Sequence, residues 1–290
     1  MRLKDAFIYY KIYDSGNGNM FRDESDRLRK VAVCTPRHEY SRASSDLERH
    51  NIGVLGSPKM AISQHDTLKT ALRRFGAEVI DVPELVDHPN SVFTRDTALC
   101  TPRGYIKLRL GLESRQGEEE WMARILDELR ESCAGKIEAP GTVEGGDVVL
   151  AGSIAFIGHS IRTNEEGIKQ LSRFLRKMGY EIRVIELPET ILHLDKVLMV
   201  LGSGKLLYCS GLVSDRDIAG YYGIDVPCGG ETTANIICLG DGELIVNRSN
   251  SEVISRLKAE KFVVHDLNLS EFAKGMGGPN CLIMPVERFS

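Results

Sequence analysis

Four short segments of the chain carry side chains that could do chemistry together. They are PNSVFTRD (89–96), VEGGD (143–147), LHLD (192–195) and GGPNC (277–281). Between them they offer four carboxylates, one imidazole and one thiol: Asp96, Glu144, Asp147, Asp195, His193 and Cys281. If these segments converge, they form an acid-rich pocket that also holds a nucleophile and an acid–base group.

A pocket with this composition suits a planar cation. A guanidinium group presents a fixed fork of N–H donors, which carboxylates accept in pairs. Cys281 follows a glycine run and would be the nucleophile. Because a free thiol is mostly protonated at neutral pH, it needs a positive neighbour, which a bound guanidinium or a protonated His193 could supply. His193 would act as general acid and then as general base, oriented by a carboxylate.

Each of these residues also has an ordinary structural explanation. A cysteine in a reducing compartment is usually buried and inert, and a histidine before an apolar strand is often a hydrogen-bonded structural residue. EGGD could be only a turn into a strand, and FTRD only a salt-bridged strand. The combination of segments, rather than one motif, favours the catalytic interpretation.

The segments stand at the starts of repeated supersecondary units. The stretches DTALCTPRGYIKLRL, DVVLAGSIAFIGHS, KVLMVLGSGKLLYCS and NIICLGDGELIVN each read as strand, glycine-containing turn and strand. We expect the first hairpin strands to begin near residues 96, 147, 197, 235 and 281. Five such units would share a core, most simply around a central pseudo-symmetric axis. The periodicity is also compatible with a doubly wound α/β sheet.

Each hairpin is expected to be followed by a helix and then by a short strand. Helical spacing of apolar residues appears in GEEEWMARILDELRESC, TNEEGIKQLSRFLRKMG and SNSEVISRLKAEK. Thr163 and Asn164 supply starting signals for the second helix, as do Ser249 and Asn250 for the third. EIRVIEL and FVVHDL then read as strands, so the predicted unit is ββαβ.

Composition restricts the class of protein. The 290 residues are 42% hydrophobic and 27% charged with a net charge of −4, which predicts a soluble globular protein that binds neither nucleic acid nor anionic membrane. The start, MRLKDAFIYYKIYDSG, lacks the apolar core of a signal peptide, and no stretch approaches the ~20 apolar residues of a membrane helix. We therefore expect a cytoplasmic protein; the sequence leaves homo-oligomerisation open.

The seven cysteines are scattered along the chain. Their odd number and wide spacing argue against a disulfide framework and against a structural zinc site. Most of them are expected to be small buried hydrophobic residues. No metal ion is predicted.

From about residue 30 to the end, the chain resembles the guanidino-group-modifying enzymes. This superfamily includes arginine deiminase, dimethylarginine dimethylaminohydrolase and the amidinotransferases, and its motifs occur here in family order. The resemblance implies one catalytic domain over residues 1–290, folded as a five-bladed α/β propeller, the pentein fold. That expectation agrees with the five repeated units.

The resemblance also implies roles for the residues of the four segments. Asp96 and the Asp195 of H-x-D would grip the guanidinium, and Cys281 would be the nucleophile. His193 would be the acid–base group, and Glu144 the carboxylate that supports it.

Four further residues match family positions around the substrate. Asn90 would contact the amino-acid end of the substrate, and Asp147 matches the conserved acid of its motif. Arg115 in SRQGE and Arg162 in IRTN resemble the arginines that hold the substrate α-carboxylate. Two clamping arginines suit a free amino acid better than a protein-bound arginine.

The predicted reaction is hydrolysis of free L-arginine to citrulline and ammonia through a covalent amidino-thioether on Cys281, with no metal or organic cofactor. Two aspartates suit an unsubstituted guanidinium, whereas SRQGE and IRTN look closer to the dimethylargininases. The chain also lacks the extra helical insertion of bacterial arginine deiminases. The loop GMGG (275–278) is expected to order on binding, since glycines permit backbone freedom.

Four alternatives remain open. A dimethylarginine dimethylaminohydrolase would give citrulline and dimethylamine, and an arginine dihydrolase would carry on to ornithine. An amidinotransferase would pass the amidino group to an amine acceptor. A propeller-fold ribosome-binding factor would be non-catalytic, but it would not keep the acid–His–Cys set that this chain carries.

Overall fold

The computed structural model of the chain describes residues 22–229 and 233–289. The N-terminal stretch MRLKDAFIYYKIYDSG, which is not expected to be a signal peptide, lies within residues 1–21, outside the described residues. None of the described helices is long and apolar enough to cross a membrane.

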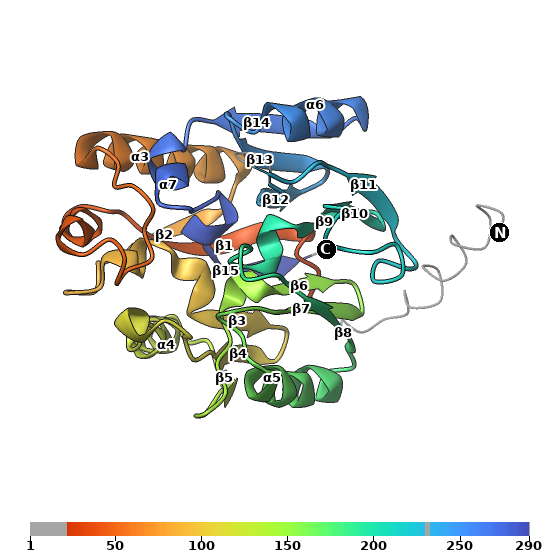
Figure 1. Ribbon diagram of the computed structural model, residues 1–290, viewed down its shortest axis with the longest axis horizontal. Helices are drawn as coiled ribbons and strands as arrows, with labels where there is room; N and C mark the ends of the chain where they lie inside the picture. The colour runs from red at the N-terminus through yellow and green to blue at the C-terminus, as the bar shows by residue number, and fades with distance from the viewer. Residues whose placement is uncertain (1–21, 230–232, 290) are drawn as a thin grey trace.

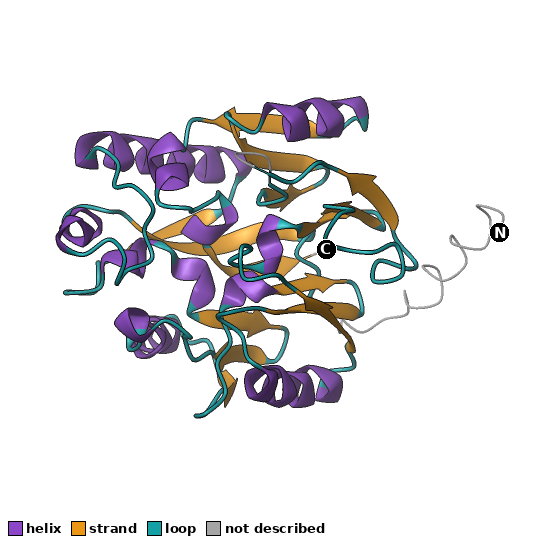
Figure 2. Ribbon diagram, in the orientation of Figure 1, coloured by secondary structure: helices purple, strands orange, loops and turns teal. Residues whose placement is uncertain are grey.

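The described strands form five small sheets of three strands each. The units in chain order are β3 (Ala98–Thr101), β4 (Gly104–Lys107) and β5 (Cys133–Lys136); β6 (Val148–Ala151), β7 (Ile154–His159) and β8 (Glu181–Glu186); β9 (Leu198–Gly202), β10 (Lys205–Tyr208) and β11 (Tyr222–Asp225); β12 (Ile237–Gly240), β13 (Glu243–Asn247) and β14 (Val263–Leu267); and β15 (Met284–Phe289), β1 (Arg27–Cys34) and β2 (Glu78–Val82). In every unit the middle strand pairs antiparallel with the first strand and parallel with the third. The sheets surround the middle of the molecule, with the longer helices outside them (Figures 1 and 2).

The four hairpins predicted from glycine-containing turns are confirmed, and the first strand of each of the five units begins one to three residues after its expected start. The strand expected near residue 281 starts no local hairpin, because β15 pairs with β1. In four units the residues just before the first strand form a 3₁₀ turn. The four turns are Thr94–Asp96, Gly145–Asp147, Leu194–Lys196 and Asn280–Leu282. They are buried and lie next to one another at the middle of the molecule (Figure 2). The pseudo-symmetry of the fold therefore brings together segments that are far apart in sequence.

The fifth sheet joins the two ends of the described chain. β15 pairs antiparallel with β1, with Pro285 opposite Val31, and β1 pairs in parallel with β2, where Val79 is opposite the same Val31. This pairing completes the fifth unit from segments at opposite ends of the sequence. It also fixes the start of β15, and hence the turn that carries Cys281, against the first unit.

The three predicted helices are confirmed as α4 (Glu118–Glu128), α5 (Glu165–Lys177) and α6 (Ser251–Ala259). Asn164 caps α5, since its side-chain oxygen accepts a 2.8 Å hydrogen bond from the N–H of Gly167. A further helix, α3 (Pro58–Phe75), connects β1 to β2 after the short α2 (Glu39–Arg42), and α7 (Ser270–Lys274) precedes the glycine run. Each long helix packs an apolar face against its sheet, because only that face can leave water.

The third unit departs from the predicted pattern, because turns rather than a helix connect β10 to β11. Ser214 and Asp217 hydrogen-bond to each other within this connection, with Ser214 Oγ donating to Asp217 Oδ2 at 2.6 Å. Such side-chain bonds compete with helix formation, and glycines at 211 and 220 weaken it further. The prediction of a helix after every hairpin is therefore wrong here.

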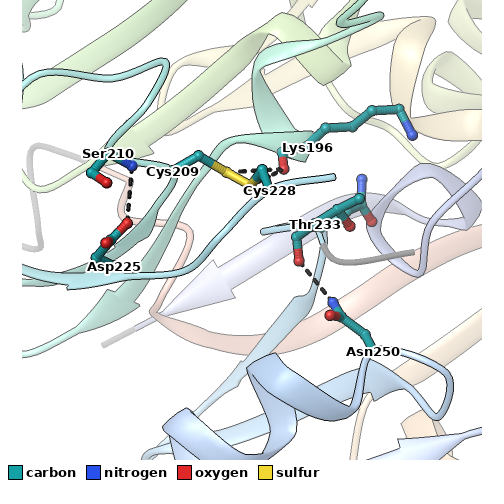
Figure 3. The surroundings of a disulfide bond; sticks show 8 residues. Lys196, Cys209, Ser210, Asp225, Cys228, Thr233 and Asn250 are labelled. Atoms are coloured by element: carbon teal, nitrogen blue, oxygen red, sulfur yellow. Dashed lines mark hydrogen bonds between the residues drawn. A yellow bond between two sulfur atoms is a disulfide. The ribbon is translucent and has the colours of Figure 1, made fainter. Parts of the chain in front are cut away.

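The same unit holds a disulfide between Cys209 and Cys228, which the sequence does not predict. The parallel pairing of β10 with β11 brings the two Cα atoms to 5.6 Å, within the range that a disulfide spans. Figure 3 shows both sulfurs beside the carbonyl oxygen of Lys196, at 4.0 and 3.8 Å. Of the other five cysteines, four are buried as predicted and Cys133 is exposed.

Candidate active site

The structure brings the six predicted reactive side chains into the middle of the molecule, on the four buried turns and the residues directly before them. All six are nearly inaccessible to solvent, with exposed fractions from 0 to 5%: Asp96, Glu144, Asp147, His193, Asp195 and Cys281. A buried charged group is stable only when hydrogen bonds or an opposite charge compensate it. The partners of each side chain therefore indicate its role in the site.

Glu144 holds the imidazole of His193. Its Oε2 lies 2.7 Å from Nε2 of His193, and its Oε1 accepts from the N–H of Gly111 at 3.1 Å and from Nη1 of Arg162 at 3.2 Å. Burial alone would raise the pKa of Glu144, but its bond to His193 and the charge of Arg162 hold that pKa well below its usual value. Glu144 is therefore a permanent anion beneath the imidazole.

The other ring nitrogen of His193 faces Asp96. Nδ1 lies 3.8 Å from Oδ1 of Asp96, is buried, and has no hydrogen-bond partner among the described residues. Burial acts to lower the pKa of His193, but Asp96 and the bond to Glu144 outweigh it and raise the pKa to about 9. The imidazole is therefore cationic at neutral pH, with one N–H still available.

A glycine of the EGGD segment makes this approach possible. A Cβ added to Gly146 would lie 2.7 Å from Nδ1 of His193, closer than real Cβ atoms come, and at a tight 3.0 Å from Oδ1 of Asp96. The N–H of Gly146 also donates to Oδ1 of Asp96 at 3.0 Å. The EGGD segment therefore forms a turn and also packs closely against the side chains of His193 and Asp96.

Asp96 is paired with Arg115. Nη1 of Arg115 donates to Oδ2 of Asp96 at 2.6 Å, while the rest of its guanidinium binds Glu118 Oε2 at 2.7 and 3.0 Å and the carbonyl of Phe93 at 3.0 Å. Burial lowers the pKa of Arg115, but Glu118 and Asp96 raise it well above its usual value. In this conformation Arg115 orients Asp96, and its predicted contact with a substrate carboxylate stays a prediction.

Two other predicted substrate-binding residues, Arg162 and Asn90, have polar atoms without a hydrogen-bond partner among the described residues. Arg162 uses Nη1 on Glu144, and its Nε and Nη2 form no hydrogen bond to the described residues. Asn90 donates from Nδ2 to the carbonyl of His50 at 2.8 Å, and its buried Oδ1 has no described partner. Both side chains therefore keep polar atoms that protein groups do not use.

Asp147 supports the chain beside His193 rather than the imidazole itself. Its Oδ1 accepts from the N–H of Leu194 at 2.9 Å, and its Oδ2 accepts from the hydroxyls of Ser160 and Thr163 at 2.6 and 2.7 Å. Burial raises the pKa of Asp147 to about 6 against these hydrogen bonds. Its geometry is that of a structural tie between the second and third units.

Cys281 lies among neutral donors and one acid. Its sulfur accepts from Nδ2 of Asn235 at 3.3 Å and from the N–H of Gly278 at 3.4 Å, and it lies 3.9 Å from Oδ2 of Asp195. Burial and the charge of Asp195 raise the pKa of the Cys281 thiol to about 12. The thiol is therefore protonated at neutral pH in the substrate-free protein.

Asp195 has no matching positive side chain in contact among the described residues. Its Oδ2 accepts from Nδ2 of Asn280 at 3.0 Å, and its Oδ1 is buried without a hydrogen-bond partner. Burial raises the pKa of Asp195 above its usual value. An acid that is buried beside a thiol and only half satisfied is the one clear electrostatic imbalance of the site.

Comparison with known proteins identifies the family. The arginine deiminase family model matches residues 81–222. The N(G),N(G)-dimethylarginine dimethylaminohydrolase of Pseudomonas aeruginosa is 33% identical over 230 residues, which are 79% of this chain and 90% of that protein. The chain belongs to the guanidino-group-modifying enzyme superfamily.

Further relatives agree with this membership. A solved structure of the Pseudomonas aeruginosa dimethylarginine dimethylaminohydrolase, a cysteine-to-serine mutant complexed with citrulline, superimposes with a TM-score of 0.78 at 28% identity, covering 91% of this chain and 100% of that one. An arginine deiminase of Listeria monocytogenes serotype 4a is 25% identical over an alignment of 252 positions that covers 69% of this chain and 62% of that protein. The pentein fold and a cysteine-dependent guanidino hydrolase, both predicted from the sequence, are confirmed.

Two asparagines outside the predicted set, Asn235 and Asn280, touch the predicted groups of this superfamily member. Asn280 directly precedes the nucleophile, in a segment whose sequence indicates only a loop. Asn235 stands at the start of the fourth hairpin, at the point where the other units carry their functional residues. That position in the repeat was the available signal, but an uncharged amide attracts less notice than an acid.

The glycines before Cys281 pack closely against neighbouring side chains. Side chains at Gly275, Gly277 and Gly278 would overlap Tyr40, Phe93 and Asn235, and none of these glycines needs a positive φ. The positive φ, 64°, belongs to Met276. The glycines thus provide space for close packing in this conformation, and the predicted ordering of the loop on binding stays a prediction.

Asp96, Glu144 and His193 also place ligand atoms within 4.8 Å of one another, a spacing that a metal ion could use. Both carboxylates, however, already pair with the fixed cations Arg115 and Arg162. A metal ion would have to displace or be repelled by these guanidinium groups. The geometry is accounted for by the ion pairs.

Proposed function

We propose that the chain hydrolyses the guanidinium group of free L-arginine to citrulline and ammonia, with Cys281 as the nucleophile. The observation that carries the proposal is Asp195, whose buried Oδ1 has no hydrogen-bond partner among the described residues and whose Oδ2 lies 3.9 Å from the Cys281 sulfur. A carboxylate in that position can accept an N–H from an unsubstituted guanidinium nitrogen. A dimethylated nitrogen offers none.

The substrate cation activates the thiol. Burial, Asp195 and Asp96 all favour the protonated form of Cys281, which is why its pKa is about 12 in the substrate-free site. A guanidinium gripped between Asp96 and Asp195 cancels the field of these acids and places a positive charge next to the sulfur. Thiolate formation is thereby coupled to binding, and the thiol proton leaves for the solvent.

The thiolate then attacks the central guanidinium carbon. The C–S bond forms as the π bond to one nitrogen opens, giving a tetrahedral adduct. His193, which is cationic because its pKa is about 9, donates its proton to the departing amino group. The C–N bond breaks, ammonia leaves, and an amidino-thioether remains on Cys281.

Neutral His193 next takes a proton from a water molecule, whose oxygen adds to the amidino carbon. Collapse of this second tetrahedral species breaks the C–S bond and expels Cys281 as a thiolate. The hydroxyl proton released as the C=O of citrulline forms then passes to this sulfur, which restores the resting thiol. Glu144 stabilises the imidazolium in both half-reactions through its 2.7 Å contact with Nε2. The catalytic groups thus return to their starting state.

The amino-acid end of the substrate is assigned to the side chains that keep unused polar atoms. Arg162 would bind the α-carboxylate with Nε and Nη2, and Asn90 would contact the same end through its unpartnered Oδ1. Arg115 would hold Asp96 in place and, if its guanidinium turns on binding, would reach the carboxylate as well. Asp147 would serve by fixing the backbone next to His193.

A second substrate, N-dimethylated arginine, is favoured by a different observation. The relative at 33% identity is a dimethylarginine dimethylaminohydrolase. The chemistry of the thiol and imidazole would be the same, with dimethylamine as the leaving group. Asp195 supports L-arginine over the dimethylated substrate, since its carboxylate would face either an NH₂ group or two methyl groups.

The test is incubation of the purified protein with L-arginine, N,N-dimethylarginine and agmatine, with citrulline, ornithine, ammonia and dimethylamine quantified. We expect one citrulline and one ammonia per arginine, and a mass increase on Cys281 after acid quench. Cys281→Ser should lower turnover by about 10⁴-fold or more. Preferred release of dimethylamine would select the second substrate, and ornithine would indicate a dihydrolase. No product from any guanidino compound would refute the proposal.

A further inference from the structure

One buried side chain touches the reacting sulfur without a part in the steps above. Asn235 is 1% exposed and stands directly before β12, at the start of the fourth unit. At the matching points of the other units the chain places Asp96, Asp147 and Asp195 or the nucleophile itself. The fourth unit therefore contributes a neutral amide to a site otherwise built from charged groups.

The orientation of this amide is fixed by its neighbours. Oδ1 of Asn235 lies 2.9 Å from the backbone nitrogen of Asn280, which can only donate a hydrogen bond. The carbonyl end must therefore face Asn280, which turns the Nδ2 donor toward the Cys281 sulfur at 3.3 Å. A Cβ on Gly278 would overlap the amide, so the absence of a side chain there lets the two approach.

The sulfur receives a second donor from the same group of residues. The backbone N–H of Gly278 points at Sγ from 3.4 Å. A thiol sulfur is a weak acceptor, whereas a thiolate accepts strongly, so two donors stabilise the anion more than the thiol. They oppose the effect of Asp195 and Asp96, which favour the protonated thiol.

We propose that Asn235 is a positioning residue for the nucleophile: together with the N–H of Gly278 it forms a two-donor cradle that aims the Cys281 sulfur and stabilises its anion. This inference rests on the proposed function of Cys281. The cradle acts twice in that reaction, since sulfur is anionic before attack and again when the C–S bond breaks. Asn235 bonds to the sulfur and to Asn280 and to none of the proposed guanidinium or carboxylate contacts, so it should affect kcat more than KM.

The first readout needs no turnover. In the substrate-free protein, the rate of Cys281 alkylation by iodoacetamide is followed between pH 7 and 10 by peptide mass mapping, which separates it from the exposed Cys133. Below its pKa, a thiol reacts in proportion to its thiolate fraction. We expect the plot of Cys281 alkylation rate against pH to shift by about one pH unit toward higher pH in Asn235→Ala. The reason is that the thiolate loses a hydrogen bond to its charged sulfur.

Two further variants separate this role from a loss of packing. Asn235→Asp keeps the acceptor for Asn280 but replaces the donor with a negative charge, so its alkylation plot should shift further than that of Asn235→Ala. Asn250→Ala is the matched control: Asn250 is a buried asparagine of the same unit that donates to the carbonyl of Thr233 at 2.7 Å and does not contact the sulfur. Asn250→Ala should leave the pH dependence of Cys281 alkylation unchanged, even if it lowers the unfolding temperature.

The second readout is steady-state hydrolysis. Asn235→Ala should lower kcat by about 10- to 100-fold with KM changed less than about threefold. The proposal would be overturned if both Asn235 variants showed the same pH dependence of Cys281 alkylation as Asn250→Ala. If no guanidino compound is hydrolysed but the alkylation shift is found, the proposed function fails while the cradle stands. If Asn235→Ala does not fold, the near-isosteric Asn235→Asp decides the outcome by itself.

Discussion

The two sides of the site differ in how their charges are paired. The imidazole side consists of His193 and Glu144, and the sulfur side consists of Cys281, Asp195 and Asn235. On the imidazole side every charge is matched before any substrate arrives, and the pKa of His193 is raised to about 9. On the sulfur side an acid lies beside a protonated thiol whose pKa is about 12. The acid–base group is ready in the resting protein, whereas the nucleophile is not.

The cause of this difference is the distribution of arginines. Asp96 and Glu144 each have a buried guanidinium in contact, from Arg115 and Arg162 respectively. Asp195, by contrast, is hydrogen-bonded by a neutral amide, and no described arginine or lysine forms an ion pair with it. A cation on the sulfur side must therefore come with the ligand. This arrangement restricts thiolate formation to the complex and protects the resting thiol from other electrophiles.

The largest expected effect comes from removing the charge beneath the imidazole. Glu144→Gln should lower kcat by about 10²- to 10⁴-fold, because the pKa of His193 falls and the imidazole loses its proton before it can donate it. The alkaline limb of the kcat–pH profile should move to lower pH. Asp147→Asn is the comparison, since Asp147 hydrogen-bonds Ser160 and Thr163 and acts on the ring only through its charge, so its loss of kcat should be smaller. Equal losses of kcat in both variants would mean that the direct contact of Glu144 with Nε2 adds nothing.

The second prediction concerns pH and stability on the imidazole side. The folded-state pKa of His193, about 9, lies above the unfolded value of 6.5, so its contribution is fully present below pH 6.5 and is lost as pH rises through about 9. The size is about 3 kcal/mol. Urea unfolding between pH 6 and 9.5 should show this loss in the wild type and a much flatter dependence in His193→Gln. Parallel curves for the two proteins would contradict the raised pKa.

The smallest expected effect sharpens the contrast on the sulfur side. Asp195→Asn removes the acid that favours the protonated thiol, so alkylation of Cys281 in the substrate-free protein should speed up by about tenfold. Hydrolysis of L-arginine should nevertheless slow, because the guanidinium loses one of its two carboxylates. This is the reverse of the effect expected for Asn235→Ala on alkylation. Slower alkylation in Asp195→Asn would show that the sulfur does not sense this acid.

Much of the fold could be predicted because its signals are local. Glycine turns between apolar runs identified four hairpins, and Asn164 followed by two glutamates identified the start of α5. The third unit resisted the same reasoning, since its missing helix depends on the Ser214–Asp217 bonds, and its disulfide depends on the pairing of β10 with β11. The domain boundaries, the oligomeric state and the cytoplasmic location remain predictions.

By itself the sequence determined which residues meet. The functional side chains occupy matching points of a repeat, and a pseudo-symmetric ring must bring matching points to its axis. Only the tertiary structure decided what each residue touches there: Arg115 on Asp96, Arg162 on Glu144, and Asn235 on the thiol. Local spacing carries no information about such contacts, because each joins elements that lie 18 to 46 residues apart, and their geometry follows from how the units pack.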